Sequence, residues 1–140
     1  MKYKTNDYVA AFRKIKISPY QIRLLQTHYH SPNKTLTATQ MAKAMGYFHF
    51  VTANSHYGKL GKMLGNALGW NKAEDKESQG APGVFVLSNF EKPGKEWFWI
   101  MRSEVAEAVE ILGWVNDTQT IIPEEIEKTF QLYEGTARTI

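Results

Sequence analysis

The sequence contains no cysteine. This absence excludes disulfide bonds, thiolate zinc sites and a cysteine nucleophile. No apolar run is long enough to span a bilayer, and the N-terminal segment MKYKTNDY lacks the apolar stretch of a signal peptide. We therefore expect a cytoplasmic protein that does not interact with a membrane.

Acidic residues are almost absent from the first half of the chain. Between Met1 and Lys72 there are eleven basic residues and a single acidic one, Asp7. Residues 73–140 carry six basic and thirteen acidic residues, so the net charge of the whole chain is only +3. Such asymmetry favours a polyanion as the partner of the basic half. The alternative is that the acidic half neutralises the basic half within one fold.

At 140 residues the chain is long enough for one domain with a sizeable apolar core. We assign residues 1–115 to this domain. Residues 116–140 are expected to form a C-terminal helix, opened by Pro123, and a tail, which pack on the same domain.

Start and stop signals predict four helices in the first half, over about residues 6–13, 18–30, 37–46 and 52–68. The second helix opens with the pair Ser18-Pro19, because serine caps a helix and proline fits its first turn. Thr37 and Gln40 form a capping box at the start of the third helix, and Gly46 ends it.

The second half favours a β-hairpin followed by a helix. The segments VFVLSNF (84–90) and WFWIM (97–101) are rich in β-branched and aromatic residues, and the turn EKPGKE separates them. Ser103 is the expected cap of the helix that follows. Before the hairpin, the polar stretch NKAEDKESQGAPG (71–83) is expected to be a loop.

This order of helices and hairpin is that of a winged helix-turn-helix. The predicted fold class is α+β, mainly helical, with the hairpin as the wing and an additional C-terminal helix. In such domains the second helix of the pair enters the major groove of DNA. We therefore expect the helix over about residues 52–68 to read a groove.

A polar face lies opposite the apolar stripe of this helix on a helical wheel. Lysines on it would supply salt-dependent attraction to phosphates, and an asparagine can form two hydrogen bonds with adenine. The predicted nucleic-acid-binding residues are Asn54, Ser55, Lys59, Lys62 and Asn66 on the helix, with Lys92 and Lys95 in the turn of the wing.

Glycines at positions 58, 61, 65 and 69 fall in one sector of the same helix, although glycine costs a helix about 0.5–1 kcal/mol relative to alanine. They indicate the close approach of another backbone. A tight crossing within the fold is the favoured interpretation, and contact with a phosphodiester backbone is the alternative.

Aromatic side chains occur on both faces of the second predicted strand. Trp97, Trp99 and Met101 alternate with Phe98 and Ile100. One face belongs to the core. The other is expected to pack as well, although it could stack on a base.

No catalytic arrangement is evident. HYHSPN, together with His49, Asn54 and His56, invites a metal site or an HNH nuclease, but no carboxylate occurs between Tyr8 and Ala73. Nucleotide-binding and serine-nucleophile motifs are also missing. We predict no enzymatic activity, no catalytic residue, no metal site and no cofactor.

The segments LTATQMAKAMGY, ANSHYGKLGKMLG and LGWV resemble a small domain found with bacterial HNH-type restriction endonucleases and as stand-alone hypothetical proteins. The similarity covers roughly residues 18–70 and 96–115. It implies recognition of DNA, including modified DNA, for an attached nuclease. This sequence carries no nuclease module, so the resemblance does not extend to cleavage.

Double-stranded DNA is therefore the expected partner of a non-enzymatic protein. One alternative is a protein-interaction or inhibitor module whose binding face is the acidic second half, with Glu104, Glu107 and Glu110 on one helix. A nuclease-associated domain with residual catalysis is a weaker alternative. The aromatic residues would also suit a homodimer interface.

Overall fold

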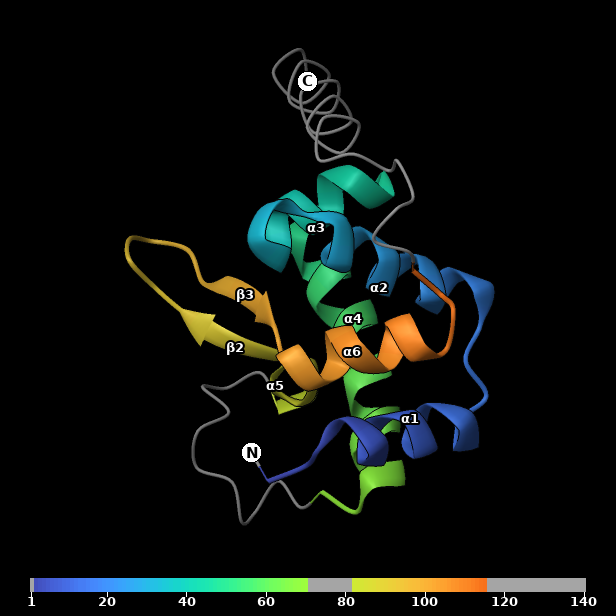
Figure 1. Ribbon diagram of the computed structural model, residues 1–140. Helices are drawn as coiled ribbons and strands as arrows, with labels where there is room; N and C mark the ends of the chain where they lie inside the picture. Colours follow the sequence, from blue (N-terminus) through green and yellow to red (C-terminus); the bar gives the residue numbers. More distant parts are fainter. Residues whose placement is uncertain (1, 71–81, 116–140) are drawn as a thin grey trace.

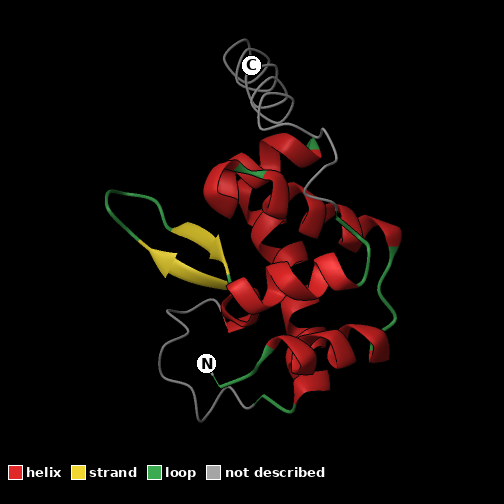
Figure 2. Ribbon diagram, viewed as in Figure 1, coloured by secondary structure: helices red, strands yellow, loops and turns green. Residues whose placement is uncertain are grey.

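Six α-helices and a three-stranded antiparallel sheet form the part of the chain that the computed structural model describes, residues 2–70 and 82–115. The α+β, mainly helical class is confirmed, and the hairpin projects from the helical body (Figures 1 and 2). The elements are α1 (Thr5–Lys14), α2 (Pro19–His30), β1 (Thr35–Thr37), α3 (Ala38–Met45), α4 (Phe50–Leu68), α5 (Pro82–Leu87), β2 (Ser88–Glu91), β3 (Phe98–Met101) and α6 (Ser103–Ile111), with a 3₁₀ turn (Pro32–Lys34) before β1.

The predicted starts of α2 and α3 are confirmed. The Gln21 backbone N–H donates to Ser18 Oγ at 3.1 Å, and the Ser18 N–H donates back to Gln21 Oε1 at 3.0 Å. Thr37 and Gln40 form the same reciprocal pair at the start of α3. Gly46 ends α3 in the left-handed conformation, with φ of 79°. These signals depend on neighbouring residues only, which is why the sequence predicts them well.

α4 begins two residues earlier than expected, at Phe50. His49 occupies the N-cap, and its Nδ1 accepts the N–H of Val51 at 3.2 Å. Gly69 ends the helix in the left-handed conformation. The helix therefore has one more half-turn at its N-terminus, and this half-turn carries the partly exposed ring of Phe50.

The sheet has the order β1-β3-β2. β1 was not predicted, because three residues between two helices are too few to show an alternating pattern. Leu36 of β1 and Phe90 of β2 both lie opposite Trp99 of β3. Directly opposite residues share a face of a sheet, so these three side chains form a row across it.

The prediction of a strand over residues 84–90 is wrong for its first half. Residues 82–87 form α5, and β2 begins only at Ser88. α5 packs along α4, and this tertiary contact outweighs the β propensity of the VFV segment. Of the loop predicted over 71–83, residues 71–81 lie outside the described part.

The contact between α4 and α5 explains two of the glycines in α4. A Cβ at Gly61 would overlap the carbonyl of Gly83, and a Cβ at Gly83 would overlap the carbonyl of Gly58. At Gly65 an added Cβ would lie 3.2 Å from a methyl group of Val86. The favoured interpretation, a tight crossing within the fold, is confirmed at Gly61 and Gly65.

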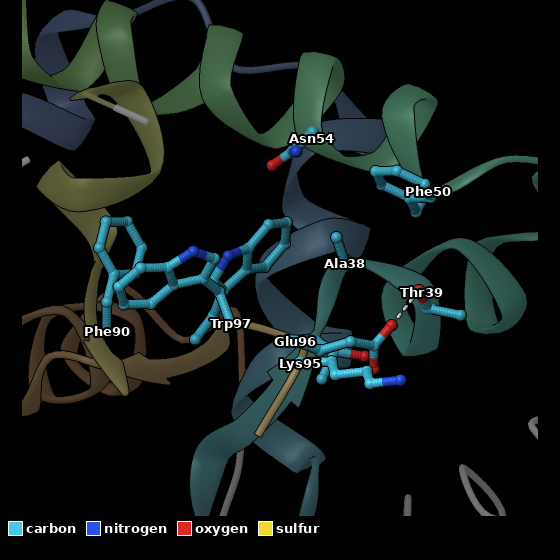
Figure 3. Close-up of a pocket in the computed structure, with 10 residues that line it drawn as sticks. Ala38, Thr39, Phe50, Asn54, Phe90, Lys95, Glu96 and Trp97 are labelled. Carbon is cyan, nitrogen blue, oxygen red and sulfur yellow. Dashed lines mark hydrogen bonds between the residues drawn. The ribbon is translucent and has the colours of Figure 1, made fainter. Parts of the chain in front are cut away.

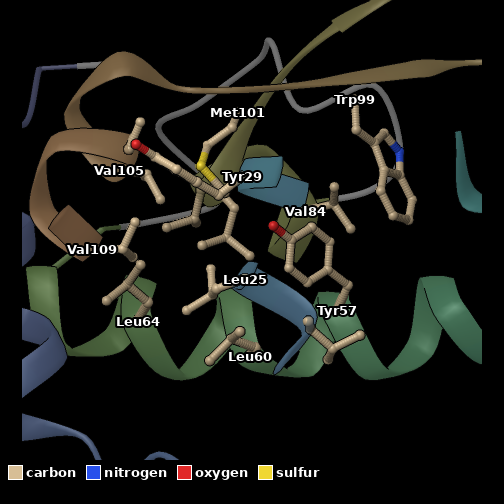
Figure 4. Packing of buried hydrophobic residues seen from close by; sticks show 14 of the residues in the cluster. Leu25, Tyr29, Tyr57, Leu60, Leu64, Val84, Trp99, Met101, Val105 and Val109 are labelled. Carbon is tan, nitrogen blue, oxygen red and sulfur yellow. The ribbon is translucent and has the colours of Figure 1, made fainter. Parts of the chain in front are cut away.

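α4 also provides the centre of the core. Its buried side chains Tyr57, Leu60 and Leu64 lie in one cluster with residues of α2, β3 and α6 (Figure 4). α1 covers this core by packing against α4 and α6. The position of α4 is therefore fixed by contacts along most of its length.

α6 is the last helix in the described part of the chain. α6 begins at Ser103, but its N-cap is Arg102, so the prediction that Ser103 caps this helix is wrong. The helix expected after Pro123 and its packing on the domain lie outside the described residues.

Candidate nucleic-acid interface

Four of the seven predicted residues lie along the exposed face of α4. Ser55, Lys59, Lys62 and Asn66 are all exposed, at spacings of four, three and four residues. This spacing follows the helical period and produces one stripe about 16 Å long, opposite the buried side of the helix. α4 contains no acidic residue. The stripe therefore presents two cations and two polar side chains without a local counter-charge on the same helix.

The turn between β2 and β3, residues 92–97, carries the two remaining lysines. Both Lys92 and Lys95 are exposed. The Nζ of Lys92 lies 5.4 Å from the centroid of the Trp97 ring, a cation–π distance. Since the hairpin projects from the helical body, this turn is accessible to a large partner such as a duplex (Figure 1).

Asn54 faces a different side of α4 from the lysine stripe. It lies on the same side as Phe50, one turn earlier, and both project toward the hairpin (Figure 3). Lys95 lines the same space from the hairpin. The structure therefore places four of the predicted residues on the stripe of α4 and two, Asn54 and Lys95, around this space, whereas Lys92 lies over the Trp97 ring.

That space is a cavity of about 370 Å³ between the start of α3, the first turns of α4 and the hairpin (Figure 3). Its walls are largely aromatic, and come from Phe50, Phe90, Trp97 and Trp99. Glu96 also lines it, and its Oε1 accepts a hydrogen bond from Thr39 Oγ1 at 2.8 Å. This bond ties the hairpin turn to α3.

The sequence predicts packing for the aromatic residues of this strand and leaves stacking on a base as the alternative. The alternation along β3 was the available signal, because it places Trp97, Trp99 and Met101 on one face. Trp99 and Met101 are 3% and 4% exposed, whereas Trp97 is 39% exposed. The same face of β3 is thus buried in the core at Trp99 and Met101 and exposed to solvent at Trp97. This face is therefore the core face, and Trp97 is its open end. Packing was expected for the other face, and Phe98 and Ile100 on that face are half-buried.

A buried histidine positions α4 against the hairpin. His28 of α2 lies 2.6 Å from the Tyr57 hydroxyl through Nδ1 and 2.9 Å from the Trp99 carbonyl through Nε2. A carbonyl can only accept, so Nε2–H donates to it and the unprotonated Nδ1 accepts from Tyr57. Burial lowers the pKa of His28 to about 4, and the ring is neutral at physiological pH.

Arg102 joins α5, β2 and β3 at the base of the hairpin. Its Nε donates to the Phe85 carbonyl and its Nη1 to Asn89 Oδ1, both at 2.9 Å. The guanidinium also lies over the Phe85 ring, 4.6 Å from the centroid. The charge is thus used inside the fold, and Arg102 is not part of the basic surface.

The histidines that suggested a metal site do not converge. His28 is in the core, whereas His56 is exposed and its ring contacts the rings of Tyr20 and Tyr47. Among the described residues there is no group of three histidine or carboxylate side chains arranged to hold a metal ion.

The acidic face of α6 is partly engaged within the fold. Glu107 accepts a hydrogen bond from Thr5 Oγ1 of α1 at 2.6 Å, and Glu110 accepts one from the Tyr29 hydroxyl of α2 at 2.7 Å. Two of the three carboxylates therefore connect α6 to neighbouring helices.

No helix in the described ranges is both long and apolar enough to cross a membrane. No family model, no curated protein and no solved structure matches the chain.

Proposed function

We propose that this protein is a non-enzymatic winged-helix DNA-binding module in which α4 enters a groove and the β2–β3 hairpin is the wing. The observation that carries this proposal is the exposed stripe of α4, where Lys59 and Lys62 stand beside Ser55 and Asn66 without an acidic neighbour on the helix. Lysines at this spacing would attract phosphates, and the two polar side chains would reach base edges.

The order of elements supports the same function. α3 and α4 follow one another through a short turn, and the hairpin that follows pairs with β1 in a small sheet. This is the arrangement expected when the second helix of the pair is offered to DNA and a hairpin lies beside it. Lys92 and Lys95 in the hairpin turn would contact a neighbouring phosphate. The sequence resemblance to a restriction-associated domain implies the same class of partner.

The alternative, a protein-interaction module acting through the acidic second half, is less favoured. Glu107 and Glu110 already bind α1 and α2. A carboxylate engaged in this way is less available to imitate the free phosphates of a nucleic acid.

Replacement of both stripe lysines tests the proposal. Lys59→Ala combined with Lys62→Ala should weaken binding to every duplex sequence. It should also reduce the slope of log affinity against log salt concentration by about two, because two phosphates would no longer be neutralised. The measurement is fluorescence anisotropy of a labelled random-sequence duplex over a salt series.

The matched control is Lys14→Ala combined with Lys16→Ala. These lysines are also exposed, and they lie at the end of α1 and just beyond it. The control removes the same charge and should leave the slope nearly unchanged. Equal slopes for the stripe variant and the wild type would remove α4 from the interface.

A further inference from the structure

The aromatic cavity beside α4 has two opposed walls. Phe90 and Trp97 from the hairpin form one wall, and Phe50 stands on the other side (Figure 3). Trp99 also lines the cavity. The Trp97 ring is supported by Phe90, with centroids 6.0 Å apart and planes at 61°. A planar ring entering this space would meet aromatic surface that is already in place.

Two polar side chains face the same space. The Asn54 amide offers a donor and an acceptor, and none of the side-chain hydrogen bonds among the described residues involves it. The Glu96 carboxylate accepts one bond from Thr39 and has capacity for more. The cavity therefore combines stacking surfaces with a donor and several acceptors.

We infer that this cavity binds one unstacked DNA base that carries an exocyclic amino group, such as cytosine, in preference to thymine. The base would stack on Trp97, its amino group would donate to Glu96, and its ring edge would bond the Asn54 amide. This inference deepens the proposed DNA-binding function and rests on it.

Charge distinguishes a base from other ligands of an aromatic cavity. Glu96 and Lys95 both line the cavity, so its lining carries one charge of each sign and favours a ligand without a full charge of its own. Aromatic rings beside a carboxylate would also suit a quaternary ammonium group. However, Lys95 lines the same cavity and Lys92 lies over the Trp97 ring, and these two cations disfavour a cationic ligand. The same lysines would attract the phosphates that flank a base.

Binding to bulged duplexes tests the inference. Three labelled duplexes of one sequence are compared: fully paired, with a single bulged cytosine, and with a single bulged thymine. The wild type should bind the bulged-cytosine duplex roughly tenfold more tightly than the paired one, a ratio typical of one base stacked on an aromatic side chain. Its affinity for the bulged-thymine duplex should be lower than for bulged cytosine.

Matched variants separate the cavity from the lysine stripe. Trp97→Ala should abolish the preference for the bulge, so that the ratio of the affinities for the bulged-cytosine and the paired duplex falls to about one. Glu96→Gln should narrow the difference between cytosine and thymine. The double variant of Lys59 and Lys62 should weaken all three duplexes in parallel and keep their ratio. Far-UV circular dichroism checks that each variant is folded.

Equal affinity of the wild type for the three duplexes, with salt-dependent binding retained, would overturn the base cavity and leave the proposed function standing. Absence of binding to any duplex would overturn the proposed function. The cavity is then tested alone by titrating deoxycytidine monophosphate while following the indole N–H resonance of Trp97, and an unchanged resonance would overturn it too. A response of that resonance to choline but not to the nucleotide would assign the cavity to a cation instead.

Discussion

At the scale of single residues, His28 connects three elements through two hydrogen bonds, to Tyr57 of α4 and to Trp99 of β3. Only the neutral ring can accept from Tyr57 and donate to the Trp99 carbonyl at the same time. His28 therefore fixes the backbone of Trp99, which lines the cavity, relative to α4.

Acidification should destabilise the protein through this residue. The pKa of His28 is about 4 in the folded chain and about 6.5 when unfolded, so below pH 6.5 the unfolded chain takes up a proton that the folded chain does not. Between pH 7.5 and pH 5 the free energy of unfolding should fall by about 2 kcal/mol from this group. The loss is complete once the pH falls below about 4.

Urea denaturation at the two pH values measures this effect. In His28→Gln the fall in the free energy of unfolding between pH 7.5 and pH 5 should be smaller by about 2 kcal/mol. The fall in His56→Gln, at an exposed position, should equal that of the wild type. The same pH dependence in His28→Gln and the wild type would contradict the assignment.

At the scale of elements, signals carried by neighbouring residues were predictable and contacts across the fold were not. The capping boxes at Ser18 and Thr37 and the glycine that ends α3 depend on four or five consecutive residues. α5 forms in a segment that contains β-branched residues because it packs closely against the glycines of α4. This contact joins segments that are distant in the sequence, so the residues of α5 alone do not predict the helix.

Alanine substitutions at two glycines of α4 test this packing. Gly61→Ala should destabilise the protein by about 1–3 kcal/mol, because the new Cβ overlaps the Gly83 carbonyl. Gly58→Ala places its Cβ in open space and should stabilise the helix by about 0.5–1 kcal/mol. Chemical denaturation compares the two variants. Tolerance of alanine at both positions would show that α5 does not pack as described.

At the scale of the whole molecule, part of the site was predictable. The exposure of Lys59 and Lys62 follows from helical periodicity and that of Lys92 and Lys95 from the turn. The cavity could not be predicted from the sequence, because it exists only where the hairpin, α3 and α4 meet. Asn54 belongs to that cavity rather than to the lysine stripe for the same reason. The low acidic content before residue 73 favours a polyanion as the partner, but it carries no information on the shape of the surface.

Binding of the wild-type protein to a random-sequence duplex over a salt series is the decisive test of DNA binding through α4 and the hairpin. If four lysines of α4 and the wing each neutralise one phosphate, log affinity should fall with log salt concentration with a slope of about −3 to −4, from a dissociation constant in the micromolar range or tighter at low salt. Absence of binding at low salt, or affinity that does not change with salt, would show that these lysines do not bind DNA.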